Sequence, residues 1–186
     1  MRFWANLIGY QLVWFCAVIA AGHGWAWPGP LAFVLFAGWQ MANSRHRAAD
    51  LKLIATAVLL GVLIDGTLAL TGWCVYATSA PAFPGGGAPI WILTLWGSFA
   101  LTLNESFRYL QKRRWLAAAL GAVGGPAAYF GASRGWHAVT LTAPAWHGVA
   151  ALAVGWGVAM PLLAGLARKW SRPKDDVILN LQELAL

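Results

Sequence analysis

Charged residues are scarce in this sequence of 186 residues. Only 10% of the residues are Asp, Glu, Lys or Arg, and only six are acidic, whereas 60% are hydrophobic. A water-soluble domain of this length needs far more charge to keep its surface solvated. The composition therefore excludes an ordinary soluble domain and predicts an integral membrane protein.

Cysteines and sequence signatures of catalysis are also missing or rare. Cys16 falls in the first apolar stretch and Cys74 in a later loop, so we expect no disulfide between them. The chain lacks zinc-site spacings, a phosphate-binding loop, a nucleophile elbow and a dinucleotide fingerprint. We therefore expect no cofactor and no metal, and we lean against an enzyme. The remaining alternative is an ion site formed by His23, His137 and His147, which all fall on one predicted side.

What the chain does have is apolar stretches long enough to cross a membrane, which takes about 20 residues. There are six, at residues 3–21, 27–43, 51–72, 89–107, 115–132 and 145–167. The first is predicted to be an uncleaved helix, because no small-x-small cleavage pattern follows it. The loop at 73–88, rich in proline and glycine, is predicted to be irregular coil. Gly121 and Gly125 have the spacing of a close helix contact.

Basic residues mark one side of this arrangement. All of the 13 Lys and Arg residues except Arg134 fall at the N-terminus, in alternate breaks between stretches, or in the C-terminal tail. Positive charge near helix ends stays cytoplasmic, so both termini are predicted to be inside. The cations form no stripe, which favours anionic lipid headgroups over nucleic acid as their partner. Ten of the 13 tryptophans fall near predicted interfaces, and Trp14, Trp96 and Trp156 at mid-depth.

The sequence thus predicts an all-α polytopic bundle of six transmembrane helices over residues 1–170. Residues 171–186 are predicted to be a short cytoplasmic tail. In it, Asp175 and Asp176 cap a helix with apolar residues Val177, Ile178, Leu181 and Leu184. This helix would lie on the membrane or dock a membrane or cytoplasmic protein partner. A frayed tail is the alternative.

Asp65 is the most informative single residue. It lies about 14 residues into its stretch, which is roughly 21 Å deep. A carboxylate costs about 2.5–3.5 kcal/mol there, so Asp65 should face the interior of the bundle with a partner. Thr94, Tyr129 and His147 reach the same half of the membrane and complete a candidate polar site. The alternative is one structural hydrogen bond.

A second candidate site lies near the cytoplasmic face. Its residues are Asn6, Gln40, Asn43, Asn104 and Glu105. The functional interpretation is a headgroup or substrate site open to the inner leaflet. The alternative, which we favour, is ordinary interhelical hydrogen bonding with a Glu105–Arg108 ion pair.

Several stretches resemble a family of small, uncharacterised proteobacterial inner-membrane proteins, known as a domain of unknown function. They are WGSFALTLNESFRYL at 96–110, GAVGGPAAYFGASRG at 121–135, the opening FWANLIGYQLVWF, and LIDG around Asp65. The resemblance implies an inner-membrane location and a multi-helix bundle, and it supplies no activity. Genes of this family often neighbour cyclopropane-fatty-acid-synthase-like and flavin-amine-oxidase-like genes. This implies a link to membrane lipid modification or envelope stress.

Three functions are therefore compared. The first is an accessory or lipid-binding component of a lipid-modification or envelope-stress system. The second is a small proton-coupled transporter that uses Asp65. The third is an intramembrane lipid-modifying enzyme with Asp65, Tyr129 and His147 as acid–base groups. We rank them in this order, because no catalytic signature is present.

Overall fold

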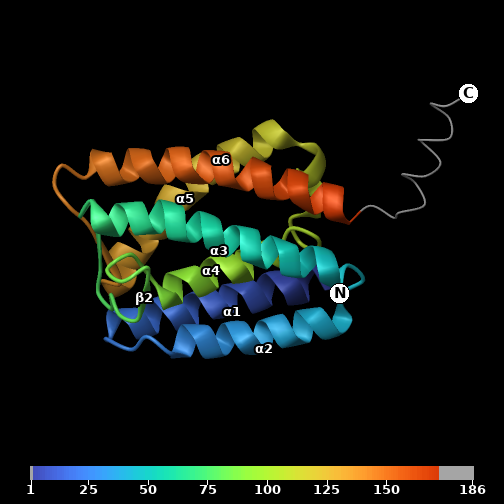
Figure 1. The fold of residues 1–186 in the computed structure, drawn as a ribbon, viewed down its shortest axis with the longest axis horizontal. Helices are drawn as coiled ribbons and strands as arrows, with labels where there is room; N and C mark the ends of the chain where they lie inside the picture. The colour runs from blue at the N-terminus through green and yellow to red at the C-terminus, as the bar shows by residue number, and fades with distance from the viewer. Residues whose placement is uncertain (1, 172–186) are drawn as a thin grey trace, which may run out of the picture.

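The computed structural model describes residues 2–171, which form a bundle of six α-helices with four short strands at one end (Figure 1). The helices are α1 (Arg2–Gly22), α2 (Pro28–Asn43), α3 (Arg47–Leu70), α4 (Ile90–Ala100), the 3-10 helix η1 (Arg108–Lys112), α5 (Arg114–Trp136) and α6 (Trp146–Trp170). The strands are β1 (Cys74–Tyr76), β2 (Ala82–Phe83), β3 (Ala88–Pro89) and β4 (Val139–Leu141). The helical fold class is as predicted. The tail helix predicted around Val177 to Leu184 lies outside the described residues.

The prediction of six spanning helices is not supported. Four helices in the described part of the chain, α1, α3, α5 and α6, are long and apolar enough to cross a membrane. This is consistent with a multi-pass membrane protein. Helix α2 has 16 residues and α4 only 11, and both fall short of the usual length of a span.

The largest error concerns the stretch at 89–107, which was expected to be one helix. Helix α4 ends at Ala100, and residues 101–107 follow as turns that are mostly buried. Side chains from elsewhere take the carbonyls that would continue the helix: Asn6 Nδ2 donates to Leu101 O and Gln111 Nε2 to Leu103 O. The surrounding protein buries most of this irregular segment, which is the condition under which a membrane protein tolerates non-helical backbone.

The loop at 73–88 is also more regular than predicted. Strand β1 pairs antiparallel with β4, and Val75 lies opposite Thr140. Strands β2 and β3 form a separate pair, with Phe83 opposite Ala88. β-Branched and aromatic residues in the short runs CVY and VTL suit a paired strand, and pairing satisfies loop backbone groups next to the apolar bundle.

The strand pairs define two ends of the bundle. We call the end with residues 72–89 and 137–145 the strand end, on the left of Figure 1. Thr78 Oγ1 donates to Ala21 O at 2.7 Å and so ties the end of α1 to this loop. We call the opposite end, with residues 43–47, 101–114 and 168–171, the basic end. Arg134, in the last turn of α5, is the exception that belongs to the strand end.

Helix α4 forms the centre of the bundle, and nearly all of its side chains are buried, including Trp91 and Trp96. A helix enclosed on every face is expected to be apolar all round, as α4 is. Helices α5 and α6 approach closely at Gly121, where an added Cβ would lie 2.2 Å from Trp156 O. At Gly125 an added Cβ would meet the Trp156 ring at 2.6 Å. The glycine pair therefore packs within the chain, against α6.

Candidate functional site

Asp65 is fully buried on α3, one helical turn after Gly61. Gly61 leaves room for the Trp96 ring, whose Cδ1 would lie 2.4 Å from a Cβ at that position. The ring thus packs closely against α3, and its Nε1 donates to Asp65 Oδ2 at 2.7 Å. The absence of a side chain at Gly61 therefore allows Trp96 to donate its hydrogen bond to Asp65, one turn further along α3.

Two tyrosines complete the set of donors. Tyr76 OH donates to Asp65 Oδ1 at 2.8 Å, and Tyr129 OH donates to the same oxygen. Tyr76 lies in β1, outside the spanning helices, where burial and then the nearby Asp65 raise its pKa well above 10. Its hydroxyl therefore keeps its proton and remains a donor at neutral pH. The carboxyl group of Asp65 thus links α3 to β1, α4 and α5.

The structure brings together two of the four residues predicted for this site, Asp65 and Tyr129. Thr94 Oγ1 donates to Trp91 O of its own helix at 2.8 Å. The His147 ring stacks on Trp73, with ring centroids 5.5 Å apart, and makes no hydrogen bond to Asp65. The arrangement supplies an enclosed acceptor with three fixed donors.

An aromatic pocket of about 320 Å³ lies beside this cluster. Its lining residues come from α1, α4, the segment after α4, α5 and α6; they are Tyr10, Trp14, Ile92, Leu95, Trp96, Phe99, Phe107, Tyr109, Leu120, Gly121, Gly124, Gly125, Ala128, Tyr129, Trp156 and Met160. Trp96 and Tyr129 belong to both groups, so two donors to Asp65 are also part of the pocket wall. Asp65 is thus placed to orient that wall.

The aromatic pocket opens at the surface of the bundle. Tyr109, Leu120 and Gly124 line it and are exposed. Inside, the Trp156 ring stacks on Trp96 at a centroid distance of 4.0 Å and an interplanar angle of 12°. Within residues 2–171, Trp156 Nε1 is the one buried side-chain polar atom without a hydrogen-bond partner.

At the basic end, the first polar network is built on Asn6, which is fully buried. Its Nδ2 donates to Gln40 Oε1 at 3.1 Å as well as to Leu101 O. Its Oδ1 accepts a hydrogen bond of 2.7 Å from Ser106 Oγ. Asn6 therefore connects α1 to α2 and to both ends of the irregular segment at 101–107.

The second network is built on Asp50, in the first turn of α3 and also fully buried. Ser44 Oγ donates to Oδ2 at 2.5 Å, and Asn104 Nδ2 donates to Oδ1 at 2.7 Å. Asn104 Oδ1 in turn accepts from Gln111 Nε2 at 2.9 Å and from Ser171 Oγ at 2.8 Å. The end of α6 is thereby tied to the segment that follows α4.

The five residues predicted for the inner cluster are therefore divided. Asn6 and Gln40 share one network, and Asn104 belongs to the other. Asn43 lies apart, with its side chain bonded to Trp39 O on its own helix. Within the described residues no ion pair joins Glu105 to Arg108, because the turns after Ala100 lack the α-helical spacing that would align them.

Sequence reasoning missed Asp50, Tyr76, Trp96, Ser44, Ser106 and Gln111. The depth of Trp96 was a usable signal, because an indole N–H far from the interfaces needs a partner. Asp50 falls just before the apolar stretch predicted at 51–72, and nothing in the sequence singled it out. Within residues 2–171, no group of three His, Cys, Asp or Glu side chains is placed to hold a metal ion.

Comparison with known proteins identifies a family and no activity. Neither a curated protein nor a solved structure matches this chain. A family model described as a protein of unknown function (DUF2878) matches residues 3–162. The expectation of a family of unknown function is confirmed at that level, and the chain belongs to the DUF2878 family.

Proposed function

We propose that this protein is a multi-pass component of the bacterial inner membrane that binds a lipid chain in the aromatic pocket. Its role would be accessory and non-enzymatic, within a membrane lipid-modification or envelope-stress system. The observation that carries the proposal is the aromatic pocket itself, which is apolar, preformed and open at the side of the bundle.

The dimensions and lining of the aromatic pocket suit such a ligand. Ligand pockets typically measure about 300–1,000 Å³ and combine apolar walls with a few fixed polar groups. Here aromatic rings dominate, and Tyr129 is fixed by its bond to Asp65. Within a bilayer, an acyl or prenyl chain gains little from leaving other lipid, so packing against rigid rings must supply the selectivity.

Both termini are proposed to be cytoplasmic. The support is the distribution of charge, because the Lys and Arg residues within 2–171 gather at the basic end, apart from Arg134. Pairing of β1 with β4 supports the placement of the loops at 72–89 and 137–145 on one common side.

A small proton-coupled transporter is the second candidate. The observation that favours it is the break in α4, since interrupted helices next to buried polar groups often form transport sites. The enclosure of Asp65 argues against a cycle of proton uptake and release there, because three donors already occupy both carboxylate oxygens. No contact favours the lipid-modifying enzyme, because His147 stands apart from Asp65.

Two glycine-to-leucine variants of the full chain, compared with wild type, test the lipid-binding proposal. Gly124 lines the aromatic pocket, and a Cβ there meets no atom within 4 Å, so Gly124→Leu fills the mouth without a clash. Gly38→Leu is the matched control, an exposed position on α2 with the same open space. Each protein is released gently from its own membrane, and retained lipid is counted by native mass spectrometry.

We expect wild type and Gly38→Leu to retain a stoichiometric lipid and Gly124→Leu to lose it. Equal retention by all three proteins would contradict the proposal, as would a wild-type protein free of lipid. Size-exclusion profiles of the three proteins check that each variant is folded.

A further inference from the structure

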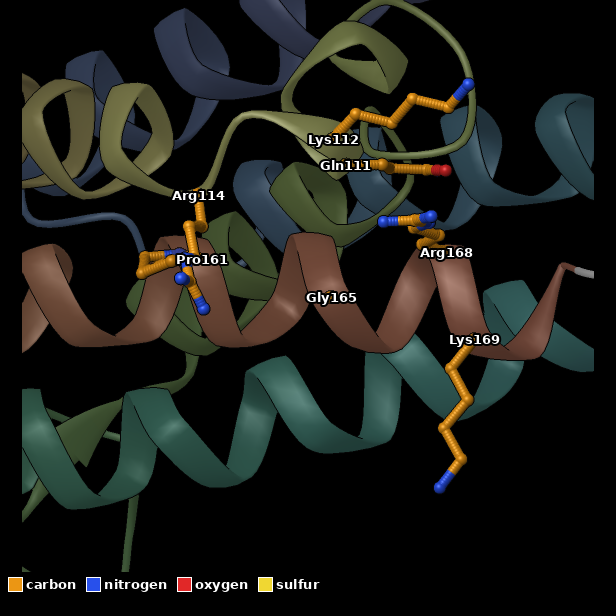
Figure 2. A pocket seen from close by; sticks show the side chains of 7 residues that line it. All are labelled: Gln111, Lys112, Arg114, Pro161, Gly165, Arg168 and Lys169. Atoms are coloured by element: carbon orange, nitrogen blue, oxygen red, sulfur yellow. The ribbon is translucent and has the colours of Figure 1, made fainter.

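A second pocket, of about 460 Å³, lies at the basic end between η1, the start of α5 and the last turns of α6. Its lining residues are Gln111, Lys112, Arg114, Pro161, Gly165, Arg168 and Lys169 (Figure 2). We call it the basic pocket. It shares no lining residue with the aromatic pocket.

The cations of the basic pocket come from two separate elements. Figure 2 shows Arg168 of α6 on the side that faces Gln111 and Lys112, while Arg114 lies over Pro161. Lys169 extends from the opposite side of α6. The lining therefore includes the guanidinium groups of Arg114 and Arg168, while the ammonium groups of Lys112 and Lys169 extend away from the space between η1 and α6.

No negative charge from the described residues balances these cations. No Asp or Glu lines the basic pocket, and within residues 2–171 no ion pair involves Lys112, Arg114 or Arg168. Like charges held around one space repel, and a bound anion relieves that repulsion while it gains charge-assisted hydrogen bonds.

The floor of the basic pocket has room for a ligand. Gly165 has no side chain, and a Cβ there would meet no atom within 4 Å. Pro161 has no backbone N–H to offer to a neighbour. Gln111 is held at the rim because its Nε2 already donates to Leu103 O and Asn104 Oδ1. The polar network at the end of α4 thus fixes one wall.

We propose that the basic pocket binds a phosphate group carried by the headgroup of an anionic membrane lipid. A guanidinium group can donate two parallel hydrogen bonds to the oxygens of a phosphate group. The proposed cytoplasmic position of the basic end supports a lipid source, because anionic headgroups and helix-end cations meet at that depth. The proposal does not depend on a ligand in the aromatic pocket.

The test measures binding of short-chain phosphatidylglycerol to the full chain in neutral detergent, by native mass spectrometry over a lipid titration. Phosphatidylcholine, with the same phosphate and a balancing positive charge, is the lipid control. Arg114→Gln with Arg168→Gln removes two pocket cations. Arg45→Gln with Arg113→Gln removes the same charge from the same end without altering a lining residue.

We expect the pocket double variant to weaken phosphatidylglycerol binding at least about tenfold, because it removes two groups that make charge-assisted hydrogen bonds to the phosphate. The control double variant should change the affinity by less than about twofold, because screened surface charge contributes little. Wild type should prefer phosphatidylglycerol over phosphatidylcholine. Equal losses in both double variants, or no loss in either, would overturn the proposal.

Gly165→Leu provides a test that leaves every charge in place. It should weaken phosphatidylglycerol binding while leaving lipid in the aromatic pocket, whereas Gly124→Leu should do the reverse. Inorganic phosphate is added as a competitor. If millimolar phosphate displaces the lipid and binds the wild type as tightly, the lipid source is wrong and the ligand is a soluble phosphate.

Discussion

Two carboxyl groups on the same helix are buried in different ways. Asp65 accepts hydrogen bonds from a tryptophan and two tyrosines, whereas Asp50, which lies nearer the basic end of α3, accepts from Ser44 and Asn104. Both carboxyl groups are fully buried. The difference follows depth: far from the ends, the donors are carried on large rings whose remaining surface is apolar, while near an end small polar side chains suffice.

The same difference appears in what surrounds each group. The rings that hold Asp65 continue into the aromatic pocket, so that cluster shapes an apolar site. The side chains that hold Asp50 continue through Asn104 and Gln111 to the rim of the basic pocket. Each buried acid therefore supports a different surface feature of the bundle.

Asp65→Ala should have the largest effect on stability. It leaves three buried donors without an acceptor, and each costs about 1–3 kcal/mol, so we expect a loss of at least about 3 kcal/mol. The measurement is equilibrium unfolding in mixed micelles, followed by tryptophan fluorescence. Asp65→Asn keeps one acceptor oxygen and should lose less. A loss for Asp65→Ala below 1 kcal/mol would show that the hydrogen bonds there contribute little.

Asp50→Ala should destabilise less, by about 2 kcal/mol, because it leaves only two donors without an acceptor, and one of them, Ser44, is half-buried. Asp50 also lies in the first turn of α3, where a negative charge is favoured by the helix dipole. The same unfolding assay measures this variant alongside Asp65→Ala. An equal or larger loss than for Asp65→Ala would reverse the ranking by depth.

The smallest effect concerns Cys74, next to the Asp65 cluster in β1. Burial raises the pKa of its thiol to about 12, so the thiol stays protonated at pH 7 and the folded protein should not react there with a maleimide. The assay uses a Cys16→Ser chain, labelled before and after denaturation in SDS. Rapid labelling before denaturation would show that water reaches the strand end of the bundle.

An exposed position at the strand end serves as the positive control for maleimide labelling of Cys74. The same position also tests the proposed topology. Gly85→Cys, in a chain with Cys16→Ser and Cys74→Ser, should be labelled by a membrane-impermeant maleimide in intact spheroplasts. Lys112→Cys, at the basic end of the same chain, should be labelled only after lysis. The opposite pattern would place the termini outside.

The sequence predicted the surroundings of Asp65 better than those of Asp50. Apolar length and charge placed Asp65 and Tyr129 at one depth, and the structure joins them. Their angular positions were not predictable, because they depend on how Gly61 admits the ring of Trp96. Asp50 was overlooked, since its partners depend on a chain turn that brings Ser44 back over α3.

The break after Ala100 could not be predicted from local sequence. The run LTLNESF is compatible with a helix end, and its conformation depends on Asn6, which lies 95 residues before Leu101 in the chain. The pairing of CVY with VTL also depends on residues that are distant in the sequence. Each strand is too short to be recognised without its partner. Predictions failed where distant side chains compete for backbone groups.

The shortness of α4 has a consequence for biogenesis. Eleven residues of α-helix extend only about 16 Å, roughly half of a hydrocarbon core of about 30 Å. The turns that follow cannot face lipid alone, and their polar partners include Gln111 and Ser171, which emerge from the ribosome later. For the proposed membrane protein, insertion would therefore not finish strictly from the first helix to the last. The centre of the bundle would become stable only after the C-terminal helices close over it.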